Sequence, residues 1–394
     1  GPFAPLSLDI PPGTAQWAHD FFAPYGGQRM PWIAVQVGAS DPMKAWRPEL
    51  FGQTLAALSR QTPVGYVFIG TESERKAIET AQMAYRQAGG RGPLCDAVGR
   101  TTLPQLAAVL AQCRLLLTND TGPMHLAVGV GTPVIDLSVG HVDFRETGPY
   151  GPGHWIVQPD MGCAPCGFDQ VCLHHACKDR LVPDQIAALC LHVLNGGAFP
   201  EKLTGIKIYR SRVDEDGLGS TELHAGREDL MVGWYGRFWR RFWFEQFTGH
   251  PSLIPAVPAP PPDWKESMAH LDRLMPLAAR LVSRAEELVR LTARRPLPIS
   301  TLQQMQLEES GERQTVVALS LQSPATASLA VALVRDTHND DGHELTGMAE
   351  CRLATYRRWR KRLHTVAAGF RSFNIAQGFA PRGTTVAIPM ARIG

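Results

Sequence analysis

Two polar segments of the chain each follow an apolar run that ends in small residues. The first segment runs from Gly38 to Glu49 and contains Ser40 and Lys44. A hydroxyl, backbone amides and a mobile positive charge at the end of a strand are able to bind phosphate groups. Taken alone, the segment has a simpler interpretation, because a loop lysine is more often a solvated surface group.

The second segment runs from Thr118 to Ala127 and places Asp120, Thr121 and Gly122 before a predicted helix. Asp and Thr are typical helix caps, and a glycine lets a ligand approach the backbone closely. Amides at the start of this helix would face a diphosphate, while Asp120 would accept hydrogen bonds from sugar hydroxyls. The alternative is an ordinary helix cap followed by a buried histidine, His125.

Four cysteines are clustered in a C-x2-C-x5-C-x4-C pattern, formed by Cys163, Cys166, Cys172 and Cys177. Four thiolates within fifteen residues can close a tetrahedral zinc site, which would act as a structural clip for a loop. An iron–sulfur cluster, disulfides and free thiols remain alternatives.

Short apolar runs alternate with helical patterns over the first two hundred residues. Strands are predicted at 32–37, 65–70, 114–118 and 133–137, and helices at 47–60, 72–88, 103–112 and 124–130. This alternation predicts an α/β fold with a Rossmann-like parallel sheet. Ligands bind such sheets beyond the carboxyl ends of the strands, where both polar segments fall.

Composition and hydropathy divide the chain into three predicted regions. Residues 1–198 form the Rossmann-like domain with a cysteine-rich loop at 160–180, residues 199–262 an aromatic and basic segment with a Pro-rich linker, and residues 263–394 an α-helical domain. Helical patterns run through 271–289, where Pro276 marks a kink or a helix start, and through 314–334 and 348–373.

The formal charge of +2 argues against a nucleic-acid partner.

The aromatic stretch from Met231 to Phe247 gathers most of its rings on one side of a helix, with arginines opposite. That composition is typical of a helix in a membrane interface, but we favour the alternative, a helix packed on the Rossmann-like domain or on its missing partner. A second run of basic residues lies between Arg352 and Arg362. It is either a solvated surface or a surface for anionic lipid or a phosphorylated glycan.

Together, the two polar segments resemble glycosyltransferase family 9, the ADP-heptose:lipopolysaccharide heptosyltransferases. The resemblance covers roughly residues 30–195. It rests on the order of Gly-Ala-Ser-x3-Lys-x-Trp-x-Pro from Gly38 and Asn-Asp-Thr-Gly-Pro-Met-His-Leu-Ala from Asn119. The stretches 69–74, 99–107, 132–134 and 148–151 continue the family pattern.

The resemblance implies a role for each matching residue. Ser40 and Lys44 match residues that hold the donor diphosphate, and Asp120 matches an aspartate that holds the transferred sugar. Three further matches lie near the phosphates, and these are Thr121, Gly122 and His125. Two more lie near the nucleoside, and these are Glu72 and Thr101. The chain departs from the pattern at Ala39, which replaces a second hydroxyl, and at Arg47, which separates Trp46 from Pro48. Both departures concern the identity of the donor.

The resemblance also implies the carboxy-terminal, donor-binding half of a GT-B enzyme. We expect metal-independent transfer of a sugar with inversion at its anomeric carbon. The first candidate for the donor is ADP-heptose, which would supply heptose. The expected acceptor is lipopolysaccharide, another bacterial surface glycan or a lipid-linked acceptor. The expected location is the cytoplasm, at the inner face of the inner membrane, with peripheral membrane contact.

The family's general base lies in an amino-terminal domain that this chain is expected to lack, because about thirty residues precede the first strand. We therefore expect a fragment that binds nucleotide and transfers poorly. The alternative is a non-catalytic nucleotide-sugar-binding or scaffolding module whose helical tail docks a partner. The order of the motifs argues against an epimerase.

Overall fold

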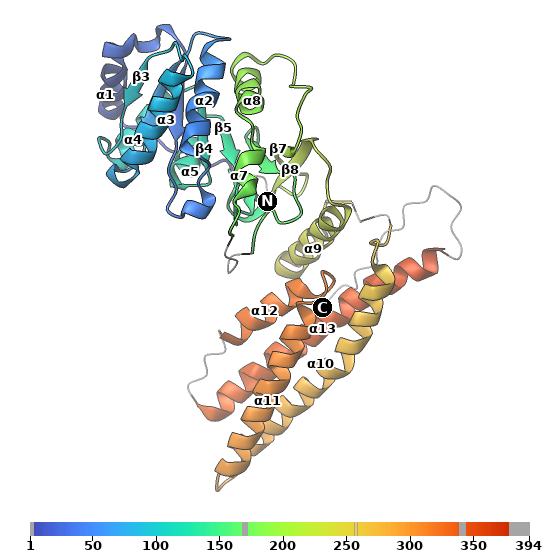
Figure 1. Cartoon of the computed structure of the whole chain (residues 1–394). Coiled ribbons are helices and arrows are strands. Elements are labelled where there is room, and N and C mark those ends of the chain that lie inside the picture. The colour runs from blue at the N-terminus through green and yellow to red at the C-terminus, as the bar shows by residue number, and fades with distance from the viewer. Residues whose placement is uncertain (1–3, 168–171, 256, 258, 339–343, 378–394) are drawn as a thin grey trace. The chain divides into compact units, whose positions relative to one another are not determined.

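The computed structural model describes residues 4–167, 172–255, 257, 259–338 and 344–377. It divides into two compact units, Gly1–Glu228 and Asp229–Gly394. The first unit is an α/β structure and the second consists of helices (Figure 1). The predicted combination of a Rossmann-like sheet with a helical tail is therefore confirmed.

The first unit is built on one sheet with the strand order β3-β2-β1-β4-β5-β6-β7-β8. The strands from β1 to β6 run parallel, and β7 and β8 are antiparallel to their neighbours. The strands are β1 (Trp32–Gln36), β2 (Gly65–Ile69), β3 (Leu94–Asp96), β4 (Leu115–Asn119), β5 (Val134–Leu137), β6 (Trp155–Pro159), β7 (Ile206–Val213) and β8 (Gly219–Ala225). The order reverses between β1 and β4, where open α/β sheets bind their ligands.

Helices cover both faces of this sheet, which explains why its central strands are apolar without interruption. Ile33 and Val35 of β1 enter the core on one face, and Trp32 and Ala34 enter the core on the other, because successive strand residues point to opposite sides. The helices are α1 (Pro12–Phe22), α2 (Pro48–Ser59), α3 (Arg75–Gln87), α4 (Leu103–Ala111), α5 (Gly122–Gly129), α6 (Phe144–Thr147), α7 (Ala176–Arg180) and α8 (Pro183–Asn195). α2, α3 and α8 pack on the first face and α1, α4 and α5 on the second.

The sheet unit extends beyond residue 198, where the sequence predicted a boundary. β7 pairs with β6, from Trp155 opposite Arg210 to Pro159 opposite Ile206, and β8 then pairs with β7. Every residue of the edge strand β8 is at least partly exposed, so the strand lacks the apolar run that identified the central strands. Residues 199–228 therefore complete the sheet.

The second unit contains α9 (Leu230–Thr248), α10 (Trp264–Thr292), α11 (Ile299–Ser320), α12 (Ala327–His338) and α13 (Leu345–Gln377). Pro276 lies inside α10. The helix expected over residues 314–334 is instead the end of α11 and the start of α12. These helices are separated by a turn in which Thr326 donates hydrogen bonds to Ser320 and Ser323.

The aromatic rings of α9 belong to the core of the helical unit. Trp234, Tyr235, Phe238 and Phe242 are buried in one cluster with residues of α10 and α13. The Pro-rich segment also packs on α9, because the Trp234 indole donates to the Ala259 carbonyl at 2.6 Å. The rings therefore pack on protein, but their partners are helices of the same unit, which the sequence analysis did not identify. In the described residues, no helix is long and apolar enough to cross a membrane.

Gly52 allows α2 to pack closely against α3. A β-carbon at this position would lie 2.2 Å from the Ala81 carbonyl oxygen and 2.7 Å from the Tyr85 nitrogen, and backbone atoms cannot move aside cheaply. We predict that Gly52→Ala lowers the free energy of unfolding of the first unit by about 2 kcal/mol, measured by chemical denaturation.

The matched control is Gly311→Ala in α11, where an added β-carbon meets nothing within 4 Å. This change is expected to raise the stability of its helix by about 0.5–1 kcal/mol, because alanine is the better helix former. Equal stability of Gly52→Ala and the wild type would contradict the packing described for α2.

Candidate functional site

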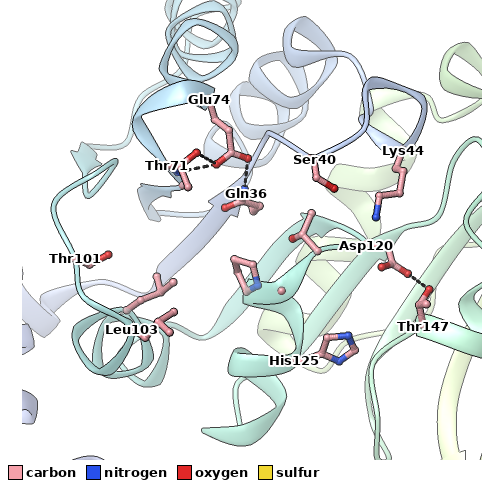
Figure 2. A pocket seen from close by; sticks show the side chains of 16 residues that line it. Gln36, Ser40, Lys44, Thr71, Glu74, Thr101, Leu103, Asp120, His125 and Thr147 are labelled. Carbon is pink, nitrogen blue, oxygen red and sulfur yellow. Dashed lines mark hydrogen bonds between the residues drawn. The ribbon is translucent and has the colours of Figure 1, made fainter.

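A cavity of about 500 Å³ lies beyond the carboxyl ends of β1, β2 and β4 (Figure 2). It is lined by Gln36, Ala39, Ser40, Lys44, Gly70, Thr71, Glu74, Thr101, Leu103, Leu106, Asp120, Thr121, Gly122, Pro123, His125 and Thr147. Seven of the eight donor-binding residues expected from the sequence are in this set. The structure therefore brings together side chains that are separated by up to 85 positions in the chain.

Asn119, the last residue of β4, joins the two polar segments. Its side-chain nitrogen donates to the carbonyl oxygens of Val37 at 2.8 Å and Gly38 at 3.2 Å, and its side-chain oxygen accepts from the Trp46 amide at 2.9 Å. Asn119 and Trp46 are fully buried. One side chain thus fixes the loop after β1 against the end of β4.

The loop after β1 presents Ser40 and Lys44 to the cavity. A short 3-10 helix, η3 (Pro42–Lys44), forms because the Asp41 carboxylate accepts a hydrogen bond from the Met43 amide at 2.8 Å. The Lys44 side chain points into the cavity (Figure 2). Within the part of the chain that the structure describes, no carboxylate lies at ion-pair distance from its ammonium group. Lys44 is therefore available to an anionic ligand.

The first turn of α5 faces the same cavity. Thr121 is the N-cap residue, but its side chain does not cap the helix as the sequence suggested. The hydroxyl instead donates to the Asn119 carbonyl at 3.2 Å and lies 3.3 Å from the Thr118 hydroxyl. A β-carbon on Gly122 would meet nothing within 4 Å, so the space beside this residue is open. The helix start carries partial positive charge that a phosphate can use.

Asp120 is held in place by a residue of α6. Its side chain accepts a hydrogen bond from the hydroxyl of Thr147, the last residue of α6, and the residue is 6% exposed. Asp136 lies behind it on β5, fully buried, and accepts from the Ser138 hydroxyl at 2.6 Å. Burial, with a smaller contribution from the nearby Asp120 carboxylate, raises the pKa of Asp136 to about 8, so Asp136 is largely protonated at neutral pH.

Glu72 does not line the cavity, although the sequence placed it at the nucleoside. Its carboxylate pairs with Arg75 at 2.7 Å, and this guanidinium holds the pKa of Glu72 below its usual value. Glu74 lines the cavity instead. It accepts from the Thr71 amide at 2.6 Å and from the Gln36 side chain at 2.8 Å, which ties the end of β2 to the end of β1.

An apolar edge completes the cavity near the start of α4. Thr101 lines the cavity as expected, followed by Leu103, whose side chain is 74% exposed, and by Leu106. The two leucines give this edge of the cavity an apolar surface. Among the residues that the sequence did not identify, Glu74 had a local signal, the Thr71-x-x-Glu74 capping box. Thr147 had none, because its role depends only on the fold.

The cysteine cluster adjoins the loop that carries Lys44. Trp46 donates its indole N–H to the Lys178 carbonyl at 2.8 Å, Arg47 pairs with Asp179 at 2.6 Å, and Lys178 donates to the Pro42 carbonyl at 2.7 Å. α7, which contains Cys177, therefore braces this loop.

The four thiols of the cluster are not in disulfides, and Cys177 is buried. Burial raises the pKa of Cys166, and the thiols of Cys177, Cys163 and Cys172 raise it further. Residues 168–171 lie outside the described chain. In the described part, no group of three or more His, Cys, Asp or Glu side chains is arranged to hold a metal ion. The zinc site therefore stays a prediction.

Comparison with known proteins agrees with this geometry. Residues 7–176 match the model of glycosyltransferase family 9 (heptosyltransferase). This segment belongs to that family.

Two curated relatives match the family 9 segment. A lipooligosaccharide heptosyltransferase 2 from Campylobacter jejuni is 27% identical over 158 residues, which cover 39% of this chain and 48% of the relative. The lipopolysaccharide core heptosyltransferase OpsX from Haemophilus influenzae is 46% identical over 123 residues, covering 30% and 33%. The chain therefore spans half or less of the length of these relatives. Among solved structures, ADP-heptose lps heptosyltransferase II from E. coli aligns with a TM-score of 0.40 and 20% identity, covering 48% of this chain and 53% of that one.

Removal of the Asn119 side chain tests how the site is held together. Asn119→Ala leaves the Trp46 amide without its acceptor and the Val37 and Gly38 carbonyls without a donor, in a fully buried place. We predict a loss of about 3 kcal/mol in the free energy of unfolding of the first unit, measured by urea denaturation. The control Asn195→Ala removes an exposed amide at the end of α8 and should change stability by less than about 0.5 kcal/mol. Indistinguishable stability of the two variants would show that Asn119 does not join the loops.

Proposed function

We propose that this chain binds the nucleotide-diphosphate sugar of a heptosyltransferase-like reaction. Bound in this way, the sugar would be transferred to a lipopolysaccharide or related glycan. The observation that carries the proposal is the convergence of Lys44 and the first turn of α5 on one cavity beside Asp120. ADP-heptose is the proposed donor, because the curated relatives are named as heptosyltransferases and the chain carries the motifs that resemble the ADP-heptose-using family. The acceptor is proposed from the names of the curated relatives. The proposed location is the inner face of the bacterial inner membrane.

The proposed reaction breaks the bond between the anomeric carbon and the diphosphate oxygen while an acceptor hydroxyl attacks from the opposite face. The electron pair of the broken bond stays on the departing nucleoside diphosphate, so negative charge grows there in the transition state. Lys44, Ser40 and the amides at the start of α5 would stabilise this charge without a divalent metal. Leu103 and Leu106 offer the apolar surface for the base, and Asp120 accepts hydrogen bonds from the sugar hydroxyls.

The attacking hydroxyl also needs a general base. Glu74 already accepts hydrogen bonds from Thr71 and Gln36, and Asp120 is assigned to the sugar. We therefore assign the base to a group outside the residues that line the cavity. Where that group is lacking, we expect nucleotide binding without efficient transfer.

Two substitutions separate recognition of the diphosphate from recognition of the sugar. Lys44→Ala is expected to weaken binding of both ADP and ADP-heptose about tenfold or more, because a charged hydrogen bond to phosphate is lost. Asp120→Ala is expected to weaken ADP-heptose about tenfold and ADP less than about twofold. Isothermal titration calorimetry measures both affinities directly.

The control Lys76→Ala removes an exposed lysine from α3, outside the cavity, and should leave both affinities unchanged. Equal weakening by Lys44→Ala and Lys76→Ala would contradict a phosphate-binding role for Lys44. If Asp120→Ala reduced ADP and ADP-heptose affinity equally, Asp120 would not recognise the sugar.

We further propose that Cys163, Cys166, Cys172 and Cys177 hold a structural zinc ion. The spacing of the cysteines supports this, and α7 next to them braces the Lys44 loop. Elemental analysis of protein purified under reducing conditions should find one zinc per chain. Cys163→Ser should lose the metal, and the control Cys351→Ser, at an exposed isolated cysteine, should keep it. A metal-free wild type would refute the zinc site.

A further inference from the structure

A second cavity lies within the helical unit, between α9 and α13. Its volume is about 360 Å³, inside the range of roughly 300–1,000 Å³ that is typical of small-molecule sites. Its lining consists of one amide and four cationic side chains, which are Gln246, Arg357, Arg358, Lys361 and Arg362. A cavity walled by cations is the chemical complement of a compact anion.

The acidic side chains nearby offset only part of this charge. Arg357 pairs with Glu286 at 2.8 Å, and Arg362 pairs with Asp336 at 3.0 Å. Asp336 is shared, because Arg335 also contacts it at 3.2 Å. Arg358 and Lys361 form no ion pair with any described residue. The cavity therefore keeps an excess of positive charge.

Arg362 adds a buried hydrogen-bond donor to this excess of positive charge. Its side chain is only 9% exposed, its guanidinium lies 5.1 Å from the centre of the Trp243 ring, and its buried Nε has no hydrogen-bond partner. Burial lowers the pKa of Arg362, and the neighbouring charges of Arg358 and Arg335 lower it further. A buried guanidinium with an unused N–H is costly unless an acceptor reaches it, and a phosphate oxygen is a strong acceptor.

The spacing of the four cations along α13 strengthens this argument. Arg357 and Lys361 are four positions apart, as are Arg358 and Arg362, so two pairs of like charges face each other along the helix. Like charges at this spacing destabilise a helix. A bound polyanion would attract all four cations and so offset the repulsion within both pairs.

We propose that the cavity between α9 and α13 is a binding site for a phosphate group, separate from the cavity at the sheet. Arg358 and Lys361 would meet the phosphate at the open side, and the Arg362 guanidinium would approach it from within. Such a group is carried by phosphorylated glycans and by lipid headgroups. The proposal does not depend on the function of the first unit.

The test is calorimetric titration with inorganic pyrophosphate, performed in a Lys44→Ala background so that the sheet cavity contributes little. R358Q/K361Q removes two exposed charges from the cavity. The control K265Q/R294Q removes two exposed charges from α10 and the turn after it, so both proteins have the same net charge. We expect R358Q/K361Q to weaken pyrophosphate binding at least tenfold, and the control to change it less than twofold.

Co-sedimentation with vesicles identifies the source of the phosphate. Retention on phosphatidylglycerol vesicles but not on phosphatidylcholine vesicles, lost in R358Q/K361Q and kept in the control, assigns the site to a lipid headgroup. Pyrophosphate binding without vesicle retention assigns it to a soluble phosphorylated ligand. The proposal is overturned if the parent protein binds neither probe, or if the control variant loses binding as much as R358Q/K361Q. Circular dichroism melting checks that each variant is folded.

Discussion

The geometry of the sheet cavity depends on one buried amide. Asn119, at the end of β4, bonds to three backbone groups of the segment after β1, accepting from the Trp46 amide and donating to the Val37 and Gly38 carbonyls. A buried side chain that makes all three hydrogen bonds is rigid, because breaking any of them leaves a buried polar group with neither a protein partner nor water to bond to. The loop with Lys44 and the helix start after Asp120 are therefore held as one structure.

This constraint explains why the neighbouring polar groups are free for a ligand. Because Asn119 satisfies the end of β1 and the backbone near Trp46, Lys44 and Ser40 are not needed to stabilise the loop. Thr121 bonds back to Asn119 instead of capping α5. α7 braces the loop from outside through Lys178 and Asp179. Structural bonds and ligand-facing groups are thus carried by different residues of the same short segments.

Local patterns in the sequence predicted the central strands, and seven of the eight donor-binding residues expected from the family resemblance line the cavity. They succeeded because buried parallel strands are uninterrupted apolar runs and the polar motifs follow directly. They failed where a role depends on distant partners. Glu74 is held at the cavity by Gln36, a residue of β1 that is distant in the sequence, whereas Glu72 pairs with Arg75. β8 has no apolar run because it is an exposed edge strand, and the burial of the α9 rings depends on α10 and α13.

The central claim is that the two strand ends form a single cradle for a diphosphate. A crystal structure of this chain with bound ADP tests it most directly. We expect the diphosphate to contact the Lys44 ammonium and the backbone amides at the start of α5 at the same time, while Asn119 keeps its present hydrogen bonds. A diphosphate that contacts only one of these strand ends, or that binds outside this cavity, would contradict it.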